Sequence, residues 1–186
     1  FRVGTDDSLT LTGTGTALDI RSGTTLTNNG TLTISGTGAN VAGTYANGSG
    51  STVIYAGQSD DSAVTIHPVP YNNLGITNAA TTYNLPPTTA SFALSGNLSL
   101  SGGTLAVTNG QTLTLSGSWI AAGGSFSAGT GMVMFNGSDG TNKAVTSSGN
   151  FHHLTFAGSD TYVLGSALGT TGDLTVAAGT LDVSPN

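Results

Sequence analysis

The chain alternates apolar and small polar residues in short runs, and Gly-containing corners separate these runs. The clearest case is GNLSLSGGTLAV at 96–107, where Leu or Val takes every second position on both sides of a Gly-Gly corner. A period of two is typical of β-strands, so this run predicts a strand, a tight corner and a second strand. A close copy, GDLTVAAGTLDV, occupies 172–183.

A longer repeat is superimposed on this short pattern. The run GTYANGSGSTVIYAG at 43–57 matches GSFSAGTGMVMFNG at 124–137, an offset of 80 or 81 residues that persists downstream. Self-similarity of this kind is typical of repeat architectures, in which each unit buries its apolar face by stacking on its neighbours. We expect one segment over 1–186, made of two copies at roughly 8–95 and 96–186 and belonging to a longer chain or a filament.

These periods predict an all-β fold, a right-handed parallel β-helix (β-solenoid) of about 8–10 coils with about 18–25 residues in each. A tandem of β-sandwiches is the alternative. Tyr and Phe occupy matching positions in the two copies, which favours an aromatic stack inside the solenoid. The residues expected to form the structural core are Val53, Tyr55, Leu98, Leu100, Leu105, Val107, Val133, Phe135, Leu174, Val176, Leu181 and Val183.

Composition narrows the classes of partner. All nine acidic residues are Asp, and only Arg2, Arg21 and Lys143 are basic, which gives a net charge of −6. Three scattered cations cannot neutralise a phosphate backbone, so nucleic acid is not an expected partner. No apolar run reaches the roughly 18–20 residues that a membrane-spanning helix needs, so we expect no membrane insertion of this segment.

The chain resembles the β-strand repeat arrays of large bacterial surface and secreted proteins, of the filamentous-haemagglutinin or autotransporter-passenger type. The units GNLSLSGGTLAV, GDLTVAAGTLDV and AGTGMVMFNG and the run FHHLTFAGSDTYVLGSAL carry the resemblance. It implies a stalk, adhesin or fibre at the cell surface or outside the cell. The lack of Cys and the scarcity of sites for trypsin-like proteases agree with an exported protein. Expected partners are the chain itself, end to end or as neighbouring repeats, and surface glycans.

Candidate ligands for a cation are few. Asp60, Asp61 and Asp139 lie in matching Gly-rich loops and offer oxygen to Ca²⁺, but a usable site needs about six to eight oxygens and neither loop has a recognised ligand spacing. Solvated turn residues are the preferred interpretation, and we expect no cofactor. His152 and His153 are neighbours on an expected strand and should point to opposite faces, so they should not share an ion.

An enzyme is the rival interpretation, because parallel β-helices also include polysaccharide-degrading proteins. Such chemistry needs paired carboxylates or a basic residue beside acidic ones, whereas Asp is scattered here and basic residues are nearly absent. We therefore expect no catalytic residues and a non-enzymatic structural or adhesion module, with a carbohydrate-binding or polysaccharide-degrading β-helix as the alternative. Trp119 has no aromatic counterpart in the first copy and is the candidate for a binding surface.

Overall fold

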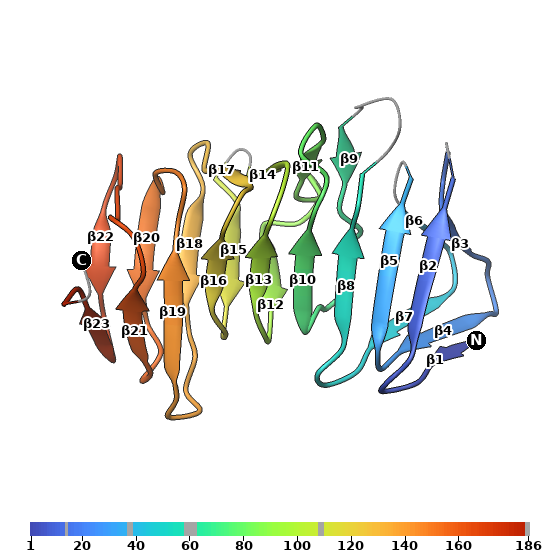
Figure 1. Cartoon of the computed structure of the whole chain (residues 1–186), viewed down its shortest axis with the longest axis horizontal. Coiled ribbons are helices and arrows are strands. Elements are labelled where there is room, and N and C mark those ends of the chain that lie inside the picture. The colour runs from blue at the N-terminus through green and yellow to red at the C-terminus, as the bar shows by residue number, and fades with distance from the viewer. Residues whose placement is uncertain (14, 37–38, 58–62, 108–109, 185–186) are drawn as a thin grey trace.

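The computed structural model describes residues 1–13, 15–36, 39–57, 63–107 and 110–184, and within these residues the chain forms strands and no helix. The strands stack along one long axis, with the two termini towards opposite ends (Figure 1). Every strand pair in the described part of the chain is parallel. The predicted parallel β-helix is confirmed, and the alternative of tandem β-sandwiches is wrong.

One nine-stranded sheet runs the whole length of the molecule and marks about eight turns. Paired residues in adjacent strands of this sheet are 19 to 26 residues apart in the sequence. The shortest separation is that of Lys143 and Tyr162, and the longest is that of Trp119 and Val145. The sheet comprises, in spatial order, β2 (Ser8–Thr12), β5 (Thr31–Ser35), β8 (Thr52–Tyr55), β10 (Asn73–Ile76), β13 (Leu98–Leu100), β16 (Trp119–Ala121), β19 (Asn142–Thr146), β21 (Thr161–Leu164) and β23 (Thr180–Asp182).

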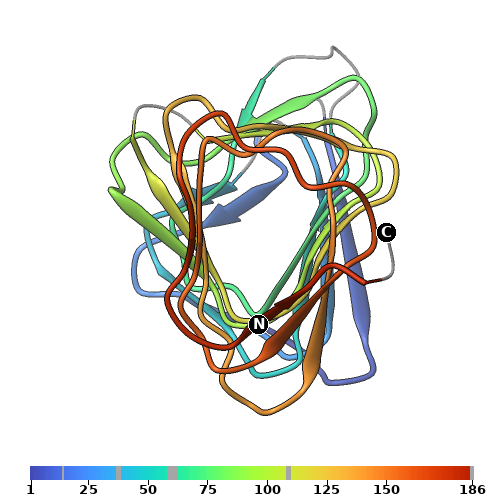
Figure 2. The ribbon, with the colours of Figure 1, turned by 90° about the vertical axis from the view of Figure 1, so that its left-hand side faces the viewer.

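Two further faces complete each coil, so the molecule is roughly three-sided when viewed along its axis (Figure 2). The second face precedes the nine-stranded sheet in each coil and comprises β1 (Arg2–Val3), β4 (Thr25–Asn28), β7 (Thr44–Asn47), β12 (Ser91–Leu94), β15 (Thr112–Leu115), β18 (Met132–Phe135), β20 (His153–Phe156) and β22 (Leu174–Val176). The third face follows it and comprises β3 (Leu18–Ile20), β6 (Ala39–Val41), β9 (Val64–Thr65), β11 (Thr82–Asn84), β14 (Thr104–Ala106) and β17 (Ser125–Ser127).

Alternation along each strand fills the interior with apolar rungs. Thr and Ser point outwards from β5 and β13, while Leu32 on β5 and Leu98 on β13 are fully buried. One ladder of inward-facing residues runs through seven consecutive strands of this sheet and comprises Leu32, Val53, Leu74, Leu98, Trp119, Val145 and Leu164. Burying a large apolar side chain stabilises the folded state by about 1.5–3 kcal/mol, so this ladder is the main source of stability.

Aromatic side chains stack between coils in the same interior. Phe135 and Phe156, register partners on β18 and β20, lie with ring centroids 5.0 Å apart and an interplanar angle of 11°. Tyr162 contacts both rings from the neighbouring face, with centroid distances of 5.3 Å and 4.9 Å. The predicted internal aromatic stack is present in the second half of the chain.

The corner inside the GNLSLSGGTLAV unit needs glycine for a reason that the structure shows. Gly103 has a φ of +64°, and Gly179, its counterpart in GDLTVAAGTLDV, has a φ of +73°. A Cβ atom at either position would collide with the carbonyl oxygens of the preceding coil, those of Asn78 and Asp160 respectively. The repeated corner glycine therefore provides both a left-handed backbone and a close approach of two coils.

The two copies of the 80-residue repeat do not occupy the same faces. β8 lies in the nine-stranded sheet, whereas β18, its counterpart, lies in the second face, three turns and two faces further along. The same shift separates β13 from β22. All three faces share one inward–outward alternation, so a strand–corner–strand unit fits at any of them. The repeat therefore specifies local geometry and not the position of a strand around the coil.

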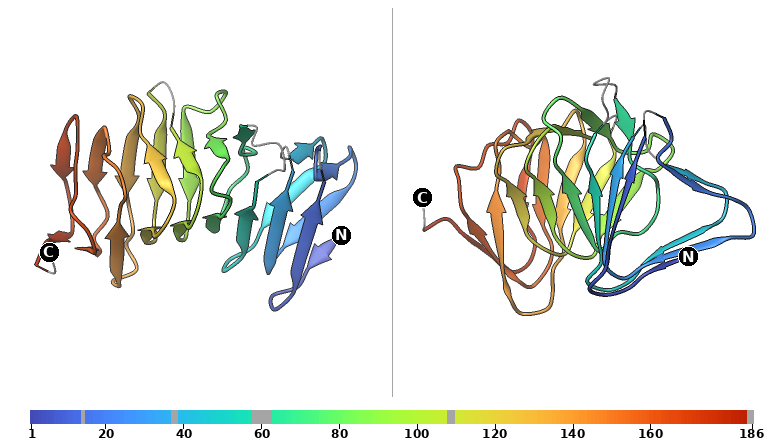
Figure 3. Two further views of the ribbon diagram at one scale, coloured as in Figure 1. Left: turned by 45° about the horizontal axis from the view of Figure 1, so that its top comes forward. Right: turned by 45° about the vertical axis from the view of Figure 1, so that its right-hand side comes forward.

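Nine of the twelve residues expected in the core are buried or partly buried, and three are not. Leu174, Val176 and Val183 are 47%, 48% and 56% exposed. They belong to the last coil, and no described strand lies beyond β22 and β23 (Figure 3). The prediction is wrong for these three because an inward-facing position is covered only when a coil lies on both sides of it. The right-handed coil stays a prediction.

Candidate functional site

The structure places Trp119 inside the solenoid and not on a binding surface. Its side chain is fully buried as the β16 rung of the inner ladder. Phe126 and Phe151 contact its ring edge-on, with centroid distances of 4.7 Å and 5.1 Å. The prediction of a contact surface at Trp119 is wrong because alternation along β16 directs residue 119 inwards.

The two histidines lie side by side, contrary to the expectation from strand alternation. Their ring centroids are 4.3 Å apart, because His152 precedes β20 and only His153 belongs to it. His152 Nδ1 lies 3.0 Å from Thr171 Oγ1, and the backbone N–H of Asp173 donates to His153 Nδ1 over 3.1 Å. Among the described residues no group of three or more acidic or histidine side chains is arranged to hold a metal ion.

The carboxylate of Asp139 is paired with the side chain of Lys143. Lys143 Nζ donates to both carboxylate oxygens, over 2.8 Å and 2.7 Å, and Thr141 donates to Oδ1 through its N–H and its hydroxyl. The hydrogen bond from Lys143 is the main reason why the pKa of Asp139 lies well below its usual value. The carboxylate that was a candidate Ca²⁺ ligand is thus already paired with the lysine ammonium. The other two Ca²⁺ candidates, Asp60 and Asp61, lie outside the described residues.

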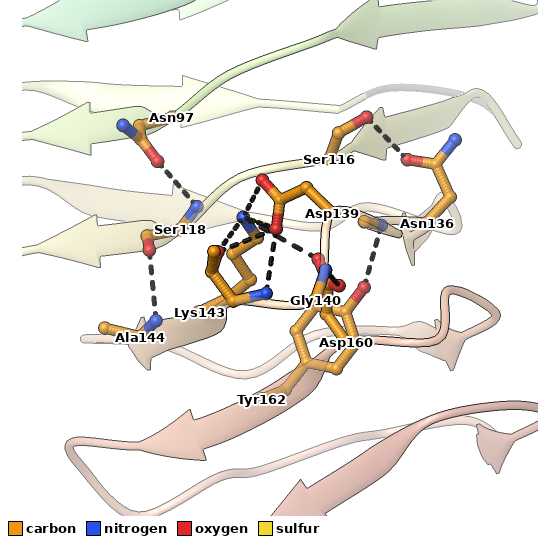
Figure 4. A network of polar contacts seen from close by, with 12 residues as sticks. Asn97, Ser116, Ser118, Asn136, Asp139, Gly140, Lys143, Ala144, Asp160 and Tyr162 are labelled. Atoms are coloured by element: carbon orange, nitrogen blue, oxygen red, sulfur yellow. Dashed lines mark hydrogen bonds and ion pairs between the residues drawn. The ribbon is translucent and has the colours of Figure 1, made fainter.

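Lys143 is the most unusual side chain of the molecule (Figure 4). It is the only lysine of the chain, and it faces the interior at the start of β19 in phase with Val145, with 10% of its side chain exposed. Asp160, just before β21, is buried completely and lies 3.6 Å from Lys143 Nζ. Its Oδ1 accepts from the N–H of Gly140 over 2.8 Å, so the carboxylate also fixes the loop between β18 and β19.

Sequence reasoning did not predict this ion pair, although the sequence contains a signal for it. Each charged residue is an even number of positions from inward-facing apolar residues, as in Lys143-x-Val145 and Asp160-x-Tyr162-x-Leu164. The two patterns belong to consecutive strands of one sheet. Charged residues at inward positions are rarely buried unless they are paired. A search for charges in phase with the apolar period, applied to adjacent coils, would have found the pair.

Buried tyrosines form a second polar cluster in the first half of the chain. Tyr71 donates its hydroxyl hydrogen to the carbonyl of His67 over 2.8 Å and accepts from Tyr55 over 3.0 Å. The N–H of His67 donates to the Tyr55 hydroxyl over 3.1 Å, which closes a three-membered ring of hydrogen bonds. Burial is the largest cause that raises the pKa of Tyr55 and of Tyr71. The ring anchors the Pro-containing segment that precedes β10.

We expect Tyr71→Phe to lower the free energy of unfolding by about 1–3 kcal/mol, because the His67 carbonyl and the buried Tyr55 hydroxyl both lose a partner. Chemical denaturation followed by circular dichroism measures the change. Tyr83→Phe is the matched control, since it removes a buried tyrosine hydroxyl that takes no part in this ring. Equal losses for the two variants would show that the ring of hydrogen bonds contributes nothing specific.

A polar groove follows the corner between the second face and the nine-stranded sheet. It crosses five consecutive coils and encloses about 550 Å³. Its lining residues are Ser49, Gly50, Asn72, Asn73, Ser95, Gly96, Asn97, Ser116, Gly117, Asn136, Ser138, Asp139 and Lys143. We call it the corner groove. Sequence reasoning did not identify it, because its members come from five corners that are about 20 residues apart in the chain and meet only when coils of unequal length stack.

No family model, curated protein or solved structure matches the chain. Among the described residues no helix is long and apolar enough to cross a membrane. The functional argument therefore depends on the solenoid, its open ends and the corner groove.

Proposed function

We propose that this chain is a rigid, non-enzymatic segment of an extracellular stalk, fibre or adhesin at the cell surface. The observation that carries the proposal is the unbroken nine-stranded parallel sheet, whose inner side carries the apolar ladder from Leu32 to Leu164. At about 4.8 Å for each strand, such a sheet gives a rod on the order of 40 Å long. A continuous ladder with a dry core resists bending, as the scaffold of a stalk requires.

The chemistry of the described side chains supports a structural role over catalysis. Asp139 and Asp160, the two carboxylates beside Lys143, are both paired with its ammonium. An acid–base pair for glycoside cleavage would need two carboxyl groups free to face a bound sugar. The histidines stand on the opposite side of β20 from the aromatic core and contact Thr171 and Asp173.

Both ends of the rod present surfaces suited to further coils. At the end near β2, a hollow of about 520 Å³ is lined mostly by Phe1, Leu9, Leu11, Leu18, Ile20 and Leu26. At the other end Leu174, Val176 and Val183 are exposed beside the unpaired edge of β23. Unpaired strand edges beside apolar rungs are templates for parallel pairing. We propose that coils of a second copy, or of neighbouring repeats in a longer chain, cover them.

Electron microscopy of the purified polypeptide over a range of concentrations tests this proposal. We expect straight rods that lengthen end to end as concentration rises. Val176→Asp/Val183→Asp should leave single short rods, because it places charges on the apolar end. Ile54→Asp/Val163→Asp adds the same two charges to outward positions of the nine-stranded sheet and should lengthen as the wild type does.

Particles that are not elongated would contradict the rigid rod, and rods that stay single at every concentration would contradict stacking of copies. A screen of the same sample against acidic and neutral polysaccharides, with and without Ca²⁺, should show no turnover. Release of reducing or unsaturated ends would favour the enzyme instead.

A further inference from the structure

The corner groove is lined by glycine residues and by polar side chains. Gly96 and Gly117 form its floor, and a Cβ atom at either would collide with oxygen atoms of the preceding coil. Larger residues are therefore excluded from the floor, and the groove continues from one coil to the next. The row of small residues keeps this corner open in successive coils, about 4.8 Å apart.

Part of this polar lining is already used to hold the coils together. Asn73 Oδ1 accepts from the N–H of Asn97 over 2.9 Å, and Asn97 Oδ1 accepts from the N–H of Ser118 over 2.8 Å. These bonds fix the orientation of the Asn97 amide, because its oxygen must face the backbone donor. The amide nitrogen consequently faces away from the protein backbone (Figure 4).

Two amide donors of the groove have no partner in the described part of the chain. Asn97 Nδ2 is one, and Asn136 Nδ2 is the other, since Asn136 Oδ1 is turned towards the hydroxyl of Ser116 at 3.0 Å. Asn97 and Asn136 belong to corners two coils apart, which corresponds to about 10 Å along the rod. Such a spacing suits an extended ligand that presents acceptors at regular intervals.

The charge of the groove selects among extended ligands. Among the described residues its charged lining is Asp139 and Lys143, which pair at 2.7 Å, and the Lys143 ammonium also faces the buried Asp160 at 3.6 Å. A polyanion would find no free cation here, because the one ammonium lies between two carboxylates. Hydroxyl and amide groups that remain, including those of Ser49 and Ser138, match the hydroxyl groups of an uncharged sugar.

We propose that the corner groove binds a linear neutral polysaccharide that lies along the axis of the solenoid, with Asn97 and Asn136 as its principal donors. No aromatic side chain lines the groove, so hydrogen bonds repeated over several coils provide the affinity in place of ring stacking. This inference rests on the adhesion role proposed above and gives it a substrate class. The groove would hold the rod against a glycan surface along its side, leaving both ends free for further coils.

Native gel electrophoresis in the presence of a dissolved polysaccharide tests the groove. The probes are hydroxyethyl cellulose, galactomannan and linear dextran as neutral polymers, with polygalacturonate as the anionic comparison. We expect at least one neutral polymer to retard the protein. Asn97→Asp/Asn136→Asp keeps both acceptor oxygens and replaces only the two outward donors, so it should weaken the binding about tenfold or more.

Asn78→Asp/Asn84→Asp is the matched control, because it adds the same two charges at the corner and face opposite the groove and keeps the hydrogen bond from the N–H of Ala80 to residue 78. It should bind as the wild type does. Equal binding by the groove variant, retardation by polygalacturonate alone, or no retardation by any polymer would overturn the proposal. Electron microscopy of the same samples separates loss of glycan binding from loss of the rod.

Discussion

Replacing Lys143 by methionine is expected to lower the free energy of unfolding by about 3–5 kcal/mol, the usual cost of removing one partner of a buried ion pair. Methionine keeps much of the apolar stem of lysine and removes the ammonium. The completely buried carboxylate of Asp160 then loses its countercharge, because the hydrogen bond that it accepts from within the described residues comes from the N–H of Gly140, which carries no charge. Urea denaturation followed by circular dichroism measures the loss.

The second substitution in this test shows whether the charge of Asp160 is responsible. Asp160→Asn keeps Oδ1 as an acceptor for Gly140 and removes the charge, so Lys143→Met/Asp160→Asn should recover most of the loss. Asp139→Asn should cost much less than Lys143→Met, since the Asp139 side chain is 63% exposed and its ion pair is screened by water. Additive losses in the double variant would contradict the pairing of Lys143 with Asp160.

The ion pair also illustrates what could be predicted from the sequence. Strand alternation and Gly corners predicted the parallel solenoid and most of its core, because one physical rule, apolar inwards and polar outwards, repeats at every coil. That rule places Trp119, Lys143 and Asp160 inwards as well. The error at Trp119 came from giving more importance to the absence of a counterpart in the first copy than to the phase of the residue within its strand.

Contacts between coils were harder to predict, because coils differ in length and the 80-residue repeat is not a whole number of turns. Residues at matching places in the two copies, such as Tyr55 and Phe135, lie on different faces and meet different neighbours. The corner groove and the tyrosine hydrogen bonds both depend on which residues become adjacent between coils. A pattern along the chain does not contain that register until the length of every coil is known.

Alkaline pH is expected to unfold the protein steeply above about pH 10, because all five tyrosines of the chain are buried. Burial raises the pKa of Tyr83 to about 12 and is the largest cause of the raised pKa values of Tyr45, Tyr55, Tyr71 and Tyr162. In the unfolded chain these phenols ionise near pH 10. The folded state, which keeps their protons, is therefore fully stable below that pH and loses stability as pH rises above it.

Each tyrosine that ionises only after unfolding lowers the free energy of unfolding by about 1.4 kcal/mol per pH unit above 10, so five of them together lower it by up to about 7 kcal/mol per unit. A domain with about 5–15 kcal/mol of stability should then unfold within one to three pH units. Tyrosinate absorbance and the circular dichroism of the strands should change in the same transition.

Tyr83→Phe removes one of these ionisable groups, so the transition should become less steep by about 1.4 kcal/mol per pH unit and move to higher pH. Tyrosinate absorbance that rises near pH 10, while the strand signal is still intact, would contradict the burial of the tyrosines.

The second copy has Phe where the first has Tyr45, Tyr55 and Tyr71. Alkaline unfolding should consequently begin in the first half of the rod, with loss of hydrogen-exchange protection in β7, β8 and β10 before β18 and β20.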